Sequence, residues 1–158
     1  MKIYSYVCLL NETGNPYMVK ADSYHIDGRK KYTYVDDVYN FIRDALGIHK
    51  CAEEFVYVLC FHNTHHLIGC FEASHGTVNS SYLSPREVYQ KALMIGAVNI
   101  IITHNHPGND ITPSEEDIAV TKKLIDAGKI IGVNVLDHIV VAQCGYCSLR
   151  EHHNDIFG

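Results

Sequence analysis

Long apolar runs are absent from this sequence of 158 residues. A helix that crosses a membrane needs roughly 20 consecutive apolar residues, and no segment approaches that length. The opening stretch MKIYSYVCLLNETG also lacks the long apolar segment and small-residue cleavage site of a secretory signal, so it predicts a strand. The six cysteines are too few and too scattered for a disulfide scaffold. We therefore expect no membrane association and a reducing, cytoplasmic location.

Positive charge is also scarce. The 13 Lys and Arg residues are outnumbered by 18 Asp and Glu residues, which gives a formal net charge of −5 with histidine neutral. Proteins that hold nucleic acid by electrostatic attraction usually present a basic face. The acidic balance therefore disfavours nucleic acid as a partner and leaves room only for a local basic patch.

Internal repeats and low-complexity tracts are missing too, and 47% of the residues are hydrophobic, which predicts an ordinary compact domain. Turn residues and hydrophobic periodicity divide the chain into strands and helices. The expected strands cover 2–10, 17–24, two segments within 54–74, 97–103, and short segments near 132–136 and 138–143. The expected helices cover 35–47, a segment that begins at 84, and about 114–128. Alternating strands and helices predict an α/β sandwich with a mixed sheet and an N-terminal hairpin.

Two of the expected helices have residues that are typical of a helix end or a helix start. Gly47 is suited to end the first helix. Ser84, Pro85 and Glu87 have the spacing of a capping box at the start of the second helix.

Histidine is abundant, with eleven residues, and two of them follow the apolar run AVNIII at a fixed spacing. Side chains two residues apart in an extended segment point the same way, so His104 and His106 are expected to face one position beyond the strand end. Pro107 stops the strand, and the next helix starts with Asp117 in its first turn. Two imidazoles and one carboxylate with a water in the fourth position form a typical catalytic zinc site. Taken singly, each feature is more typical of solvated loop residues or an ordinary helix start. The joint pattern His-x-His-Pro, six residues, Ser, two residues, Asp has five fixed positions and favours the metal site.

A zinc hydrolase also needs a base that accepts a proton from the water. The segment CAEEFVYVLCF places Glu53 and Glu54 at the start of a strand, where one side chain points inward and the other is solvated. The pattern alone does not decide between them.

The residues HNHPGNDITPSEED, together with EEFVYVLCF and VLDHIVV, resemble the JAMM (MPN+, JAB1/MPN/Mov34) metalloproteases, and most closely their RadC-like bacterial branch. The resemblance extends from about Val35 to Glu151, while residues 1–34 match nothing assigned. It divides the chain into an N-terminal hairpin extension, 1–34, and a RadC-like JAB/MPN domain, 35–158. It implies a three-layer α/β/α sandwich of the cytidine deaminase-like kind.

The resemblance also implies functional roles. One Zn²⁺ per chain would be held by His104, His106 and Asp117, with Glu54 as the general base and Glu53 as the alternative. Ser114 would hydrogen-bond the substrate carbonyl or the developing oxyanion. The implied reaction is hydrolysis of a peptide or isopeptide amide in an unknown peptide or protein substrate.

Three differences from these relatives bear on the implied function. Gly108 and Asn109 stand where the RadC-like branch usually has Ser-Gly, which changes the loop and removes no ligand. We see no counterpart of the N-terminal helix-hairpin-helix region of full-length RadC proteins, which weakens the expected link to DNA repair. We also see none of the insertions with which deubiquitinating relatives hold ubiquitin, so ubiquitin is not implied as a substrate. The alternatives are a non-catalytic MPN interaction module and a RadC-like protein associated with DNA repair.

Other cysteine and histidine motifs have simpler interpretations. CGYC at 144–147 is half of a zinc site or a redox pair, but without a second CxxC it is more typical of a structural strand end. We expect His138 to be a packed, hydrogen-bonded core residue. The doublets His65–His66 and His152–His153 are typical of solvated turns and tails.

Overall fold

A computed structural model describes residues 1–76 and 83–158 of the chain. The elements in chain order are β1 (Lys2–Leu10), β2 (Pro16–His25), α1 (Val35–Phe41), the π-helical turn η1 (Ile42–Leu46), the 3₁₀ turn η2 (Ile48–Lys50), β3 (Glu54–Phe61), β4 (Leu67–Gly76), α2 (Pro85–Ile95), β5 (Asn99–Asn105), α3 (Glu115–Ile131), β6 (Asn134–Ala142), β7 (Gly145–Ser148), α4 (Leu149–His152) and the 3₁₀ turn η3 (Asn154–Ile156). No helix among these residues is long and apolar enough to cross a membrane.

The described strands form one mixed sheet of seven, in the order β2-β1-β4-β3-β5-β6-β7. The β1–β4 and β5–β6 pairs are parallel, and the other neighbours are antiparallel. A mixed sheet was predicted from the alternation of hairpins and helices, and the prediction is confirmed.

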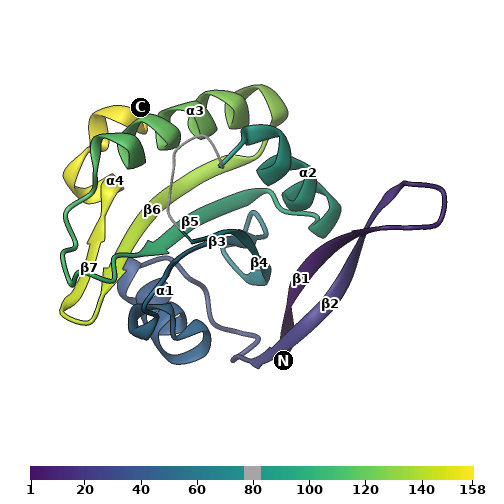
Figure 1. Cartoon of the computed structure of the whole chain (residues 1–158), viewed down its shortest axis with the longest axis horizontal. Coiled ribbons are helices and arrows are strands. Elements are labelled where there is room, and N and C mark those ends of the chain that lie inside the picture. The colour runs from purple at the N-terminus through teal and green to yellow at the C-terminus, as the bar shows by residue number, and fades with distance from the viewer. Residues whose placement is uncertain (77–82) are drawn as a thin grey trace.

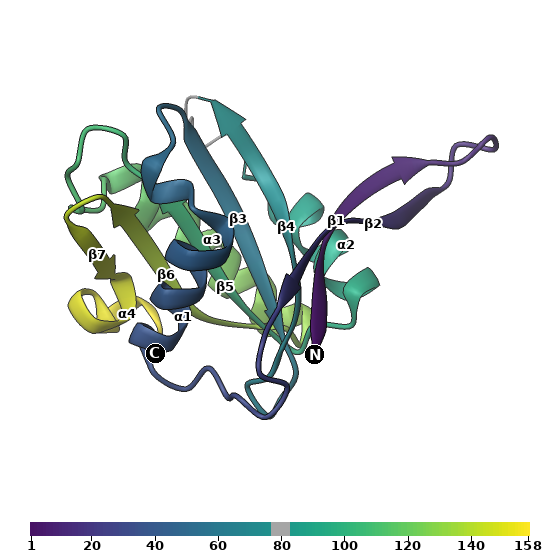
Figure 2. The ribbon, with the colours of Figure 1, turned by 90° about the horizontal axis from the view of Figure 1, so that it is seen from below.

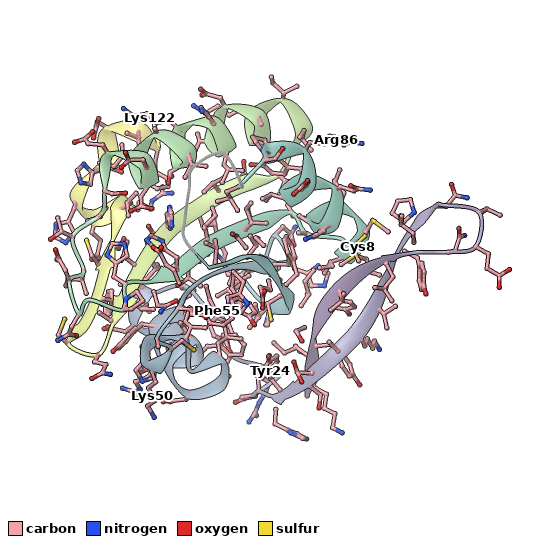
Figure 3. All side chains as sticks on the ribbon, in the orientation of Figure 1. Cys8, Tyr24, Lys50, Phe55, Arg86 and Lys122 are labelled. Carbon is pink, nitrogen blue, oxygen red and sulfur yellow. The ribbon has the colours of Figure 1, made fainter. Side chains whose placement is uncertain are left out.

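Helices cover both faces of this sheet, as Figures 1 and 2 show, with α2 and α3 on one side and α1 on the other. The layers follow from the period of two in each strand, which sends successive side chains to opposite faces. In β5, Ile100 and Ile102 join the core beneath α2 and α3, whereas Ile101 joins the core beneath α1. On the outer side of α2 and α3, Arg86 and Lys122 are exposed (Figure 3). The three-layer α/β/α prediction is therefore confirmed.

The predicted N-terminal hairpin is also present, and its tip extends away from the rest of the molecule (Figure 1). Its base belongs to the main sheet, because Tyr4 and Ser5 of β1 pair with Gly69 and Cys70 of β4. Tyr24 of β2 packs edge-on against Phe41 of α1, with the ring centroids 5.8 Å apart, and is labelled in Figure 3. The division of the chain at residues 34 and 35 stays a prediction.

Several local expectations are corrected. The two short strands near 132–136 and 138–143 are one strand, β6, because its interrupting polar residue Asp137 is buried and hydrogen-bonded inside the fold. Its carboxylate accepts from the backbone N–H groups of His138 and Arg150 and from the Ser148 hydroxyl. The polar residue therefore marks a buried network rather than a break in the strand.

Two helix ends also differ from expectation. The side chain of Ser84 makes no capping hydrogen bond, although its carbonyl oxygen accepts from the backbone N–H groups of Glu87 and Val88. Helix α3 continues past Gly128 to Ile131, because Gly132, at φ 83°, takes the left-handed conformation that ends the helix. Gly47, at φ 67°, ends the first helical segment as predicted.

Candidate metal centre

The two histidines of the HNH segment lie where β5 ends against the first turn of α3. His104 and His106 occupy the same face of the strand as Ile100 and Ile102, so both point toward α3. Their Nε2 atoms lie 2.9 Å apart. The backbone N–H of His106 donates to the carbonyl oxygen of Val141 at 2.9 Å, which keeps the chain attached to β6 beyond the strand end.

Asp117 reaches the same position from α3. Its Oδ1 lies 3.4 Å from Nε2 of His104, and its Oδ2 lies 3.8 Å from Nε2 of His106. Burial alone would raise the pKa of Asp117, but hydrogen bonds with His104, His106 and Ser114 outweigh it and hold that pKa well below its ordinary value. The site therefore presents a carboxylate anion to the two imidazoles.

A capping box fixes this carboxylate. The Ser114 backbone N–H and hydroxyl donate to Oδ2 of Asp117 at 2.8 and 2.6 Å, and the Asp117 N–H donates to the serine oxygen at 3.1 Å. The reciprocal bonds satisfy two otherwise free N–H groups at the helix start. The hydroxyl predicted to contact a substrate is thus engaged with Asp117 in this structure.

The two candidate bases are separated by strand alternation. Glu54 shares the face of Val56 and Val58 and brings its Oε1 to 3.9 Å from Nε2 of His106. The Glu53 carboxylate is hydrogen-bonded to Nε2 of His75 on β4, and its side chain is 66% exposed. Of the two glutamates, Glu54 is therefore the one whose carboxylate lies next to the histidine pair.

Asn105, the residue between the histidines, explains how Glu54 is held. Its side chain points to the opposite side of β5 and is almost completely buried, at 1% exposed. Its Oδ1 accepts from the backbone N–H of Phe55 at 2.8 Å, and its Nδ2 donates to the carbonyl oxygen of Glu53 at 2.9 Å. These hydrogen bonds fix the backbone on both sides of Glu54. The sequence analysis missed this role. The signal that could have indicated it is an asparagine between the two histidines of a buried strand, where its side chain faces away from them.

Two further residues support the site from behind. His104 Nδ1 lies 2.8 Å from Nε2 of His138, whose Nδ1 lies 2.6 Å from Oγ1 of Thr121. The prediction of His138 as a packed, hydrogen-bonded residue is confirmed, at 1% exposure. Burial, followed by the nearby His104, lowers the pKa of His138 to about 3, so its imidazole is neutral. Thr121 was missed, although it is four residues after Asp117 and so shares its helix face.

The donor atoms lie at separations typical of side chains that share one metal ion. Ligands bound to zinc at about 2.0–2.2 Å in tetrahedral geometry lie about 3.3–3.6 Å from one another. The two histidine Nε2 atoms lie 2.9 Å apart, and the Asp117 carboxylate approaches them through different oxygens, with Oδ1 3.4 Å from His104 and Oδ2 3.8 Å from His106. Glu54, His104 and His106 form a second triad whose ligand atoms lie within 4.8 Å of one another. Of the two carboxylates, that of Asp117 approaches a histidine more closely, at 3.4 Å against 3.9 Å, and its side chain is more buried, at 4% against 22% exposure.

The loop between the histidines and α3 accommodates the departure from the family pattern. Asn109 has φ 58°, in the left-handed region that glycine favours and asparagine tolerates. Its Oδ1 accepts from the backbone N–H of Cys144 at 2.8 Å, and its carbonyl accepts from the Cys144 thiol at 3.3 Å. Cys144 therefore braces the histidine loop against the turn before β7, and both cysteines of the CxxC are free.

Comparison with known proteins agrees with this geometry. A family model described as "RadC-like JAB domain" matches residues 32–154. A UPF0758 protein of Methanococcoides burtonii is 36% identical over 132 residues, covering 84% of this chain and 57% of the relative. A UPF0758 protein of Alkaliphilus oremlandii is 38% identical over 133 residues, covering 84% of this chain and 54% of the relative. The chain spans about half the length of these curated relatives. It belongs to the RadC-like JAB-domain family.

Proposed function

We propose that the protein is a zinc-dependent hydrolase of peptide or isopeptide amide bonds. The observation that carries the proposal is the convergence of His104, His106 and Asp117 on one position, with Glu54 beside it. A bound zinc ion would supply a water whose pKa is lowered to about 7 and a Lewis acid for the amide carbonyl. We propose one ion per chain, and a cytoplasmic location from the scattered free cysteines.

Exposure supports an open site rather than a closed structural one. His104 and Asp117 have side chains that are 1% and 4% exposed, so the back of the site is sealed. His106 and Glu54 retain 20% and 22%, so water and a substrate reach the front. A structural zinc site is normally closed by four protein ligands, whereas a catalytic one keeps a position open.

Glu54 is the proposed general base. In this role its carboxylate accepts a proton from the attacking water and delivers it to the departing amine nitrogen, so that the amide C–N bond breaks with the amine neutral. Asn105 holds the backbone on either side of this residue. Because buried Asn105 fixes the backbone around it, the Glu54 carboxylate keeps its position at the edge of the site, which suits repeated proton transfer.

Ser114 is the proposed donor to the substrate carbonyl. Its hydroxyl has a single proton, which it donates to Asp117 in this structure. To act on a substrate, that proton has to turn toward the carbonyl oxygen, where one donor typically contributes about 10²–10³-fold to turnover.

The test uses zinc-loaded protein, a panel of peptide and isopeptide amides, and two matched variants. Glu54→Gln is expected to retain about one zinc per chain and to lose turnover by about 10²–10⁴-fold. Glu53→Gln, which neutralises the carboxylate that faces His75, is expected to behave like the wild type. Turnover that survives in Glu54→Gln, or is lost in Glu53→Gln, would contradict the assignment.

Zinc content, amide turnover and binding to DNA distinguish the proposed function from its alternatives. A wild-type protein that binds zinc and cleaves no member of the panel would favour a non-catalytic interaction module. Retention on DNA at moderate salt would favour the DNA-associated reading, because such binding depends on neutralised phosphates.

A further inference from the structure

We propose that Thr121 and His138 act as positioning residues that fix the tautomer of His104, so that its Nε2 presents a lone pair to the metal. The inference rests on the proposed zinc site. It assigns functions to two buried residues that contact neither the ion nor a substrate in that proposal.

The direction of the hydrogen bonds starts at the carbonyl oxygen of Asp117, which can only accept. Oγ1 of Thr121 lies 2.6 Å from it and therefore donates its single proton there. The same oxygen lies 2.6 Å from Nδ1 of His138. With its proton already engaged, the threonine oxygen can only accept at this second contact. His138 therefore carries its proton on Nδ1.

The next contact transfers this constraint to the ligand. His138 is 1% exposed, and its two ring nitrogens contact the Thr121 hydroxyl and the His104 ring, with no carboxylate of residues 1–76 and 83–158 at hydrogen-bond distance. Because these surroundings favour a single N–H on the ring, and that proton is on Nδ1, its Nε2 is an acceptor. Nδ1 of His104 lies 2.8 Å from that nitrogen and must donate to it. The remaining nitrogen of His104, Nε2, is left with a lone pair on the side of the proposed ion.

The tautomer of His106 is fixed in the same way, with the proton on Nδ1, by the backbone carbonyl of Asp110. Its Nδ1 lies 2.8 Å from the carbonyl oxygen of Asp110, which can only accept, so Nδ1 carries a proton. In the neutral forms, the two Nε2 lone pairs then face one another at 2.9 Å. Two acceptors that close repel unless a cation or a proton lies between them. A metal ion or a proton at this position, which Asp117 also faces, removes the repulsion.

Loss of the constraint has a defined consequence for metal binding. Partners that orient a ligating histidine typically contribute about 10–100-fold to metal affinity. Without the acceptor on His138, His104 can place its proton on Nε2, and zinc must then displace that proton. The chain Thr121–His138–His104 thus acts on affinity through the tautomer of one ligand.

The main variant is Thr121→Val, which keeps the side-chain shape and removes the hydroxyl. We expect its zinc dissociation constant to rise by about 10–100-fold, and Thr121→Ser, which restores the hydroxyl, to return it to within a few-fold of wild type. Thr103→Val is the matched control. Thr103 is buried in β5 next to His104, and within the described part of the chain its hydroxyl has no hydrogen-bond partner. That control should bind zinc like the wild type.

A second readout is independent of zinc and of turnover. In metal-free protein labelled with ¹⁵N at histidine, two-bond ¹H–¹⁵N correlations should show His138 and His104 protonated on Nδ1 in the wild type. In Thr121→Val, the His138 signal should lose this preference. His104 protonated on Nε2 in the wild type, or a folded Thr121→Val with unchanged zinc affinity, would overturn the proposal. Protein that shows these tautomers and affinities but hydrolyses no amide would instead contradict the proposed reaction alone.

Discussion

At the scale of single residues, the HNH segment uses both faces of one strand end. The two histidines face α3, and the asparagine between them faces the other way and holds the segment that bears Glu54. Three consecutive residues thus supply the two imidazoles and hold the backbone on either side of Glu54. This coupling makes Asn105 the residue whose replacement should separate metal binding from turnover.

Asn105→Asp tests this separation. The substitution keeps the shape of the side chain but places an oxygen where Nδ2 donates to the carbonyl of Glu53. We expect the free energy of unfolding to fall by about 1–3 kcal/mol, because a buried acceptor loses its partner. Turnover should fall as well, while zinc remains at about one per chain because no ligand is altered. Urea unfolding, metal analysis and the amide assay measure the three quantities.

Asn99→Asp is the control for that prediction. Asn99 lies at the other end of β5, where its amide donates to the carbonyl oxygen of His62 at 3.1 Å. The same chemical change there should reduce stability without a selective loss of turnover. Equal losses of turnover in the two variants would contradict a specific function for Asn105.

The meeting of His104, His106 and Asp117 was predictable at this scale, but the approach of Glu54 to the histidines was not. Strand alternation and the helix-start carboxylate indicated His104, His106 and Asp117 from local spacing alone. The choice between Glu53 and Glu54 depends on the pairing of β3 with β5, in which Val56 lies opposite His104. That register joins residues 48 positions apart in the sequence, and no local pattern encodes it.

At the scale of elements, the start of α3 combines two functions in one turn. The capping box that begins the helix also orients the carboxylate of Asp117 toward the histidines. Farther along, Gly128 lets this helix approach α2 and the following strand. A Cβ atom at this position would overlap the carbonyl oxygen of Val133 and lie 2.5 Å from the Tyr89 hydroxyl. That hydroxyl donates to the Leu124 carbonyl oxygen at 2.5 Å.

Gly128→Ala is therefore expected to destabilise the fold. Alanine would gain about 1 kcal/mol from helix propensity, but overpacking against backbone atoms typically costs about 1–3 kcal/mol. We expect the cost to dominate, because the Val133 carbonyl cannot move without shifting the start of β6. Thermal and urea unfolding check the sign. An unchanged or raised midpoint would show that α3 can move away from the sheet freely.

Helix limits were harder to predict than helix existence. Gly128 has the composition of a helix end, yet close packing explains its presence, and Gly132 ends the helix instead. Asp137 likewise interrupts an apolar pattern because its partners come from β7 and α4. In both cases a tertiary contact overrides the local signal.

At the scale of the whole molecule, the mixed sheet joins the N-terminal hairpin to the domain that contains the site. The fold class followed from the order of strands and helices, but the pairing of β1 with β4 could not be read from the sequence. Ile3 is 2% exposed and belongs to the core beneath α1. The hairpin base therefore contributes to the same core as the rest of the fold.

Deletion of residues 1–25 tests the predicted domain division. We expect a loss of at least about 2 kcal/mol in the free energy of unfolding, since burial of one large aliphatic side chain alone contributes about 1.5–3 kcal/mol. The deletion also leaves β4 as an unpaired edge strand, which favours aggregation. Unfolding experiments on the two proteins would decide. A shortened protein as stable as the full chain would make residues 1–34 an independent extension.

The zinc site itself is tested most directly by diffraction from zinc-soaked crystals on both sides of the zinc absorption edge. We predict one strong anomalous peak about 2.0–2.2 Å from Nε2 of His104, Nε2 of His106 and one carboxylate oxygen of Asp117. A peak bound by Glu54 in place of Asp117, a peak at Cys144 and Cys147, or none between the two histidines would contradict the account.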